Sequence, residues 1–228
     1  MISTVRELDV RPFPPAERHA LVFKTFDELP QGGSFVLIAD HEARPLYYQL
    51  RAERPGIFLW VPLIGFKTEI MKLAPKDSEV VVSAFFERDH AEIDTLFVLL
   101  RADVAARRPA AAIYDDFNSR LERHIRWEEE ILFPAVEAKV PTLGAGPGRV
   151  MRQEHEEIRR LKALAETILH NPVAGPGDYE EAAQALASTL AVLLDHNRKE
   201  EVIYYPMADQ VLSPFEARAL LARVRALV

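Results

Sequence analysis

Two pairs of similar segments in this chain carry histidine and glutamate at spacings that suit metal coordination. Residues 124–134 align without a gap with residues 196–206. Both segments begin with His, carry Glu four residues later, and end in an aromatic residue followed by Pro. A shorter match relates residues 89–93 to residues 154–158, and the second position of each of these segments is His. Imidazole and carboxylate groups that recur in this way are candidate metal ligands.

The spacing of each His and Glu places both side chains on one side of a helix. Residues four apart lie one turn above each other, with Cβ atoms roughly 5–6 Å apart. His124 and Glu128 can therefore point into a bundle core together, and so can His196 and Glu200. With one histidine from each shorter segment, the repeat provides four imidazoles and two carboxylates. The candidate metal ligands are His90, His124, Glu128, His155, His196 and Glu200.

Six nitrogen and oxygen ligands are too many for one tetrahedral ion. They suit two ions, each held by two histidines and both bridged by the two glutamates, about 3.5–4 Å apart. A carboxylate on the inward face of a bundle is costly unless it is paired or coordinated, which favours this interpretation over isolated surface residues. A ligand set without thiolate favours iron, manganese or zinc, and spacing alone does not choose among them.

Other polar and aromatic residues near the candidate ligands have weaker claims. Glu154 suits either a solvated surface position or a place beside the metals, where it would line an access path or bind a metal-bound water. Asp89 and Glu92 could orient His90, but charge on the helix surface is the favoured interpretation. Four aromatic residues are expected to pack the end of the bundle: Trp127, Phe133, Tyr204 and Tyr205.

The candidate ligands fall in a region whose apolar pattern is helical almost without interruption. Four long helices joined by short loops predict an all-α, antiparallel up-down-up-down four-helix bundle with a short extra C-terminal helix. Asp178 with Glu181, and Ser213 with Glu216, are N-cap signatures. The glycine- and proline-rich residues 141–147 are expected to form a loop. The predicted helices cover residues 79–106, 112–139, 148–169, 179–211 and 214–227.

The first third of the chain has a different pattern, with prolines and short apolar runs. It predicts a βαβαββ order: a small α+β sandwich with one sheet and helices on one face. Pro75-Lys76-Asp77 marks the boundary, so the expected domains cover residues 1–75 and 76–228. The expected strands cover residues 8–11, 34–39, 57–61 and 67–73, and the expected helices cover residues 16–29 and 45–53.

Composition and charge exclude several classes of protein. Hydrophobic residues make up 49% and charged residues 28% of the chain, which is typical of a soluble globule rather than of a disordered or fibrous protein. A net charge of −7 argues against a dedicated nucleic-acid-binding protein. The chain has no cysteine, which excludes disulfides, thiolate zinc sites, iron–sulfur clusters and thiol catalysis. We find no signal peptide or membrane span and expect a cytoplasmic protein.

With these motifs, residues 80–212 resemble the hemerythrin-like (HHE cation-binding) family, whose di-iron site lies inside a four-helix bundle. The resemblance implies two iron ions in an Fe–O–Fe type site, with manganese or zinc left open by the ligand types. It also implies that Glu128 and Glu200 bridge the ions. The terminal ligands that it implies are His90, His124, His155 and His196.

The chain departs from the oxygen-carrying hemerythrins in two ways. Those carriers place a second His one turn along the third helix, where this sequence has Met151 and Arg159. On the fourth helix they have Asp five residues after His, where this sequence has Glu201, the second choice for the bridge after Glu200. Both departures bring the chain nearer to bacterial proteins implicated in nitric-oxide and oxidative stress and in the repair of iron centres.

Residues 8–12, 18–19, 26–30 and 40–50 carry a second resemblance, to a small domain of unknown function (DUF2249) often found beside hemerythrin-like domains. It covers residues 7–74, and the expected βαβαββ order is similar to the TusA-like sulfur-carrier fold. Because the chain has no cysteine, persulfide relay is excluded. Four basic residues could form an anion-binding corner, although ordinary surface positions are favoured: Arg11, His19, His41 and Arg44.

The leading hypothesis is a cytoplasmic non-haem di-iron protein that binds or reacts with O2, NO or peroxide in stress sensing or iron-centre repair. One alternative is a regulatory module that binds O2 or NO reversibly without turnover, and another is a structural bundle that holds zinc or manganese. The expected partners are a small diatomic ligand or peroxide, with a protein partner through the first domain left open. Neither nucleic acid nor a membrane is expected as a partner.

Overall fold

The computed structural model describes residues 6–73 and 81–227. The chain divides into two compact units, Met1–Glu79 and Val80–Val228. The boundary predicted at residues 75–77 lies outside the described residues.

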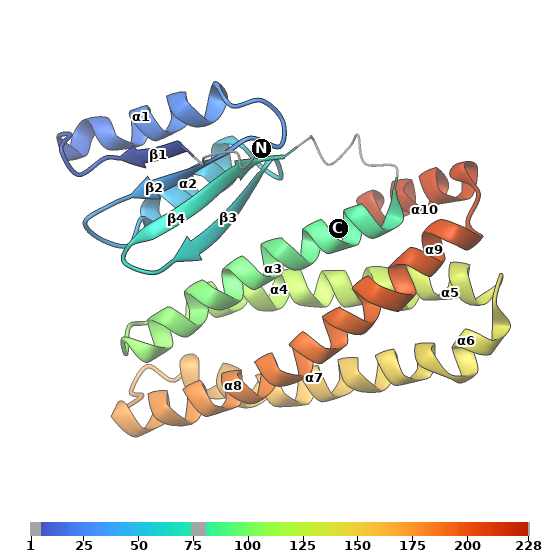
Figure 1. The fold of residues 1–228 in the computed structure, drawn as a ribbon. Coiled ribbons are helices and arrows are strands. Elements are labelled where there is room, and N and C mark those ends of the chain that lie inside the picture. Colours follow the sequence, from blue (N-terminus) through green and yellow to red (C-terminus); the bar gives the residue numbers. More distant parts are fainter. Residues whose placement is uncertain (1–5, 74–80, 228) are drawn as a thin grey trace. The chain divides into compact units, whose positions relative to one another are not determined.

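The first unit is a four-stranded sheet with two helices, in the predicted βαβαββ order (Figure 1). Its strands lie in the order β1-β2-β4-β3, in which β1 and β2 are parallel and the other neighbouring pairs are antiparallel. The turn between β3 and β4 contains Gly65 at a φ of 75°, which glycine adopts without strain. The elements are β1 (Arg6–Asp9), α1 (Pro15–Asp27), β2 (Ser34–Ile38), α2 (Arg44–Glu53), β3 (Phe58–Leu63) and β4 (Lys67–Lys72).

Both helices of this unit cover the same face of the sheet, because both pack on Phe58 of β3: its ring centroid lies 6.4 Å from that of Phe26 in α1 and 6.0 Å from that of Tyr47 in α2. Along β2, Phe35 and Leu37 are buried, and the residue between them is partly exposed. Tyr47 of α2 packs edge-on against Trp60 of β3, with ring centroids 5.5 Å apart. Phe26 of α1 is fully buried. The prediction of a small α+β sandwich is therefore confirmed.

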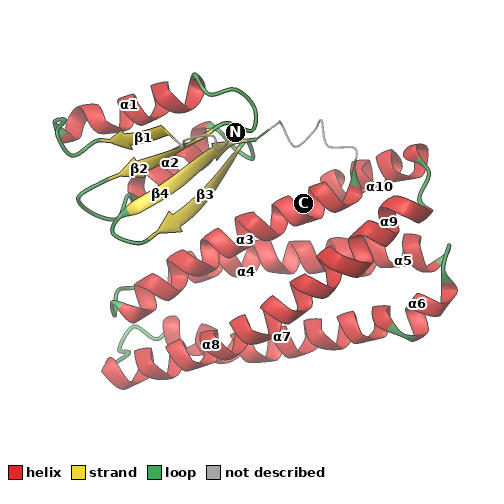
Figure 2. Cartoon of the chain, in the orientation of Figure 1, coloured by secondary structure: helices red, strands yellow, loops and turns green. Residues whose placement is uncertain are grey.

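The second unit is the predicted helical bundle with a short C-terminal helix (Figure 2). Two of its four long stretches are interrupted by a π-helical turn, labelled η, which the sequence did not predict. The loop prediction for residues 141–147 was wrong in part, because a short helix forms there. The elements are α3 (Val82–Ala105), α4 (Ala111–Trp127), η2 (Glu128–Leu132), α5 (Phe133–Glu137), α6 (Pro141–Ala145), α7 (Pro147–Leu169), α8 (Pro176–Lys199), η3 (Glu200–Tyr204), α9 (Tyr205–Val211) and α10 (Pro214–Ala226).

The two π turns occupy equivalent positions of the internal repeat, and a proline explains each of them. In η2 the backbone N–H of Phe133 donates to the carbonyl of Glu128, five residues earlier. In η3 the N–H of Tyr205 donates to the carbonyl of Glu200 in the same way. The next residue in both segments is Pro, which has no N–H and whose ring clashes with the carbonyl four residues before it. A widened turn removes that clash, and such turns often lie at functional sites.

The N-caps of two helices test the predicted helix starts. At α10 the Ser213 hydroxyl accepts a hydrogen bond from the Glu216 N–H, and the Glu216 carboxylate accepts one from the Ser213 N–H, as predicted. The prediction that Asp178 is an N-cap was wrong. α8 begins at Pro176, and Asp178 accepts a hydrogen bond from the backbone of Gly175 at 2.6 Å. Proline suits the first helical position, so this helix begins one turn earlier.

The short helix α10 closes the end of the bundle at which both π turns lie. Its Leu220, Leu221 and Val224 are buried in an apolar cluster that also contains Trp127. The indole Nε1 of Trp127 donates to the carbonyl of Leu227 at 3.0 Å. Among the described residues, no helix combines the length and the apolar character needed to cross a bilayer.

Candidate metal centre

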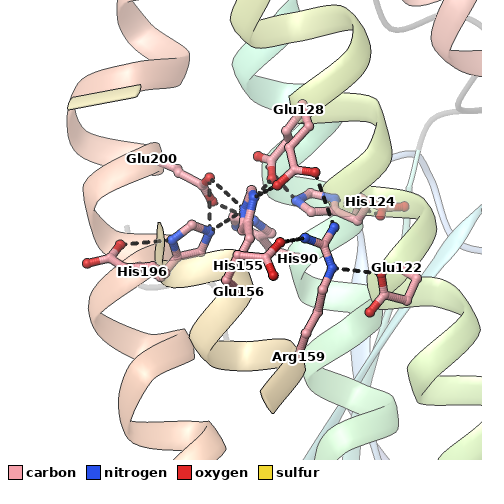
Figure 3. Close-up of polar contacts among 12 residues, drawn as sticks. His90, Glu122, His124, Glu128, His155, Glu156, Arg159, His196 and Glu200 are labelled. Carbon is pink, nitrogen blue, oxygen red and sulfur yellow. Dashed lines mark hydrogen bonds and ion pairs between the residues drawn. The ribbon is translucent and has the colours of Figure 1, made fainter. Parts of the chain in front are cut away.

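All six predicted ligands meet inside the bundle (Figure 3). They come from four helical stretches. His90 comes from α3 and His155 from α7, while each of the other two stretches provides a His and the Glu that follows it by four residues. None of the six residues is more than 3% exposed. They are His90, His124, Glu128, His155, His196 and Glu200.

The six side chains form two overlapping groups of possible metal donors. The first group contains His90 and His124, and the second contains His155 and His196. Glu128 and Glu200 belong to both groups. Within each group the donor atoms all lie within 4.8 Å of one another. The two groups could therefore hold two neighbouring cations that share two carboxylates.

Each shared carboxylate turns one oxygen toward each group. Oε1 of Glu128 lies 3.5 Å from Nε2 of His124, and Oε2 lies 3.2 Å from Nε2 of His155. Oε2 of Glu200 lies 3.4 Å from Nε2 of His90, and Oε1 lies 3.1 Å from Nε2 of His196. This division of oxygens is what a pair of bridging carboxylates requires.

Two of these buried oxygens lack a hydrogen-bond partner. Within the described part of the chain, Oε2 of Glu128 and Oε1 of Glu200 receive no hydrogen bond, and both belong to the second group. Buried carboxylate oxygens are almost always satisfied, so an unsatisfied pair needs an explanation. A cation held between these two oxygens and the two neighbouring imidazoles would explain them. The donor atoms are all nitrogen or oxygen, which fits iron, manganese or zinc.

A carboxylate outside the centre holds the Nδ1 atom of every one of the four histidines. These hydrogen bonds fix the orientation of each ring, so that Nε2 faces the centre. Glu129 and Glu201 directly follow the shared glutamates, whereas Asp89 and Glu154 directly precede a histidine. The pairs are His90 with Glu201 at 2.8 Å, His124 with Asp89 at 3.0 Å, His155 with Glu129 at 2.8 Å, and His196 with Glu154 at 3.0 Å.

This outer ring shows contacts of three acidic residues that the sequence did not predict. Asp89 is fully buried and contacts His124 on the neighbouring helix, so neither surface charge nor a partner for His90 describes it. Glu201 belongs to neither donor group and contacts His90 from outside. Glu154 pairs with His196 and Lys199 of the neighbouring helix, so it is not a free surface carboxylate, and its place on an access path stays a prediction. The internal repeat pointed to these contacts, because Asp89 is equivalent to Glu154 and Glu129 is equivalent to Glu201.

Sequence reasoning missed one residue of the centre, Tyr205. Its hydroxyl donates a hydrogen bond to Oε1 of Glu128 at 2.6 Å and lies 3.2 Å from Oε2 of Glu200. The hydroxyl oxygen of Tyr205 also lies 3.0 Å from Nε2 of His90 and 3.3 Å from Nε2 of His124. The prediction that Tyr205 only packs the bundle end was therefore wrong.

The other three aromatic residues do pack where they were predicted to. Trp127, Phe133 and Tyr204 are buried in the apolar cluster at the π-turn end of the bundle. Phe133 is the repeat equivalent of Tyr205, and its ring stacks on the imidazole of His155 with an angle of 6° between the planes. The comparison of these two equivalent positions was the available signal for Tyr205, since the two residues differ by one hydroxyl.

The electrostatics of the cluster favour positive charge. Burial opposes a charge on His90, but the hydrogen bonds to Glu200 and Glu201 outweigh burial and raise the pKa of His90 to about 10. Burial likewise opposes a charge on His196, but Glu200 raises its pKa to about 10. Burial would raise the pKa of Glu128, but the neighbouring imidazolium groups hold it well below its usual range. The carboxylates therefore favour positive charge on the imidazoles of this cluster.

The basic residues singled out in the first unit do not converge on one site. Arg11 pairs with Asp9 and Arg44 pairs with Glu42, each through a contact of 3.0 Å or less. The remaining two, His19 and His41, line a surface pocket together with Arg18, Asp40 and Pro15. Carboxylates neutralise much of the positive charge that an anion-binding corner would need.

Comparison with known proteins supports the two-part organisation. The family model described as the hemerythrin HHE cation binding domain matches residues 81–208, which is more than half of the chain. The model described as an uncharacterized conserved protein (DUF2249) matches residues 7–63. No solved structure matches the chain.

One curated relative is the iron-sulfur cluster repair protein YtfE from Musicola paradisiaca (strain Ech703). It is 22% identical over 142 residues, which covers 56% of this chain. The chain spans 62% of the length of that relative.

Proposed function

Because this chain belongs to the hemerythrin HHE cation-binding family, we propose that its bundle holds two iron ions that bind or react with O2, NO or peroxide, in stress sensing or iron-centre repair. The observation that carries the proposal is the division of the carboxylate oxygens: Glu128 and Glu200 each turn one oxygen toward two different pairs of histidines. The similarity to a protein named for iron-sulfur cluster repair supports the choice of iron and of a repair role.

In this proposal the two donor groups have separate terminal ligands and common bridges. His90 and His124 would hold one ion, and His155 and His196 would hold the other. Glu128 and Glu200 would be shared by both ions. Glu200 is preferred over Glu201 because Glu201 lies in neither donor group. When bound, an iron pair supplies one-electron redox chemistry and coordination positions for a small ligand.

The surrounding residues prepare the centre for that chemistry. The outer carboxylates hold each imidazole with Nε2 inward, so the rings already face the centre before an ion binds. Apolar side chains such as Phe86 and Phe133 pack directly against His124 and His155 and exclude water from this end of the centre. Without an ion, the Tyr205 hydroxyl donates a hydrogen bond to Oε1 of Glu128, so it lies beside the first group before any metal binds.

Metal analysis and colour test the proposal. We expect about two iron atoms per chain in protein purified from its native host. After anaerobic loading with Fe(II) and exposure to air, we expect absorption in the near-ultraviolet and visible. Zinc or manganese in the native protein, with no colour after iron loading, would instead support a structural bundle.

Turnover separates the two iron-based functions. Catalytic loss of NO or peroxide with the iron-loaded protein would support a reactive centre, for which an electron donor must be supplied. A stoichiometric and reversible change of colour with O2 or NO would support a binding module that signals occupancy without turnover.

A further inference from the structure

The hydroxyl of Tyr205 lies among the donor atoms of one metal position only. Four donor atoms of the first group surround its oxygen at 2.6–3.3 Å, two from carboxylates and two from imidazoles. These four atoms are the ones that would face an ion held by His90 and His124. No other described side chain outside the six candidate ligands places an oxygen in contact with so many of them.

The spacing of these atoms is that of neighbouring ligands on one ion. Nitrogen and oxygen ligands lie about 2.0–2.2 Å from a first-row metal ion, so two ligands at right angles lie about 3 Å apart. The Tyr205 oxygen stands at 3.0 Å from Nε2 of His90 and 3.2 Å from Oε2 of Glu200. It is therefore placed as a fifth donor of the first group rather than behind one of the other four.

The packing around the ring keeps the hydroxyl in this place. Tyr205 is fully buried. Its ring packs against Phe86 with centroids 5.2 Å apart and against His90 with centroids 5.5 Å apart. A large buried ring cannot swing into solvent without opening the bundle, so the oxygen stays beside the first group when an ion binds.

The π turn is what brings this side chain to the centre. In an α-helix the residue five positions after Glu200 would point about 140° away from it. In the π turn the N–H of Tyr205 bonds to the carbonyl of Glu200, so one full turn separates the two residues and they share a face. The equivalent turn η2 relates Phe133 to Glu128 in the same way, but the side chain of Phe133 has no hydroxyl.

We propose that the oxygen of Tyr205 is an additional ligand of the iron ion held by His90 and His124, so that the two metal positions are chemically inequivalent. This inference rests on the proposed di-iron function. Tyrosine oxygen is an established iron ligand in proteins. On binding, the phenol O–H bond breaks, its electron pair forms the bond to iron, and the proton leaves to solvent. Among the described residues, no tyrosine oxygen contacts His155 or His196, so an ion at the second group would lack this ligand and could bind a small molecule there.

Optical and resonance Raman spectroscopy of the ferric protein tests this ligand. Wild type, Tyr205→Phe and Tyr204→Phe are loaded with Fe(II) without oxygen and then oxidised with air, and iron per chain is measured for each. Tyr204→Phe is the matched control, because it removes a buried phenol that faces Glu137 instead of the centre. We expect wild type and Tyr204→Phe to show a visible phenolate-to-iron charge-transfer band with enhanced tyrosine ring vibrations. Tyr205→Phe should lose the band and keep about two iron atoms.

The outcomes separate this inference from the proposed function. Wild type that holds iron but shows no tyrosine ring vibrations would overturn the Tyr205 assignment and leave the di-iron proposal intact. Persistence of the band in Tyr205→Phe would also overturn it. Failure of all three proteins to bind iron would overturn both proposals. If Tyr205→Phe does not fold, the wild-type Raman spectrum alone decides whether a tyrosine is coordinated.

Discussion

At the scale of single residues, the histidines of the centre make a direct prediction about metal content. His124→Ala or His196→Ala should lower the bound metal by at least one ion per chain, because each removes a terminal ligand from a position that has only two imidazoles. Elemental analysis after iron loading checks this. His170→Ala is the matched control, since His170 is an exposed residue at the end of α7 that pairs with Asp115. Unchanged metal content in both centre variants would remove the ligand assignment.

The two adjacent glutamates of η3 should differ in their effect. Glu200→Ala removes an oxygen from both donor groups and should abolish binding of the metal pair. Glu201→Ala removes only the carboxylate that orients His90, and loss of such an outer partner costs about 10–100-fold in metal affinity. Titration of both variants with Fe(II) under argon checks the order. A larger loss in Glu201→Ala would assign the bridge to Glu201.

Metal binding should release protons and strengthen as the pH rises. In the metal-free protein the pKa values of His90 and His196 are raised to about 10. Both side chains are therefore expected to be positively charged imidazolium groups at neutral pH. An ion must displace these protons, and their competition weakens as the pH approaches 10. Calorimetric titration with Zn²⁺ near pH 7, in buffers of different ionisation enthalpy, measures the proton count. Binding without proton release would contradict the charged state of the cluster.

At the scale of secondary-structure elements, the cap of α10 should contribute measurably to stability. Ser213→Ala removes the hydroxyl that accepts from the Glu216 N–H, and loss of such a cap costs about 1 kcal/mol. Because α10 is buried against Trp127, we expect the whole bundle to become less stable. Urea unfolding of the metal-free protein measures the shift. Ser188→Ala, in the exposed part of α8, is the control, and an equal effect of both substitutions would contradict the role of the cap.

The ligand set followed from the sequence because helical periodicity relates His124 to Glu128 without any knowledge of the fold. The same periodicity could not predict η2 and η3, since it assumes a constant turn. The π turns moved two residues onto the metal-facing side, Phe133 and Tyr205, which were assigned to packing alone. The role of Asp89 depends on contact across two helices, and spacing along one helix contains no information about that contact.

At the scale of the whole molecule, the change from short strands to long helices predicted both folds, and both were confirmed. The order of the sheet, β1-β2-β4-β3, was not predicted, because strand length and apolar pattern do not say which strands pair. The described residues of the first unit add none of the six candidate ligands. The chemistry proposed for this chain therefore depends on residues of the bundle.

The internal repeat has a consequence for how such a centre can change over generations. A dimer of two identical hairpins would carry every substitution twice, so its two metals would always have the same surroundings. Here both hairpins lie on one polypeptide, and a single codon decides whether position 205 holds Tyr while position 133 keeps Phe. Covalent fusion of the halves thus allows the two proposed metal positions to have different surroundings, because each half can change without the other.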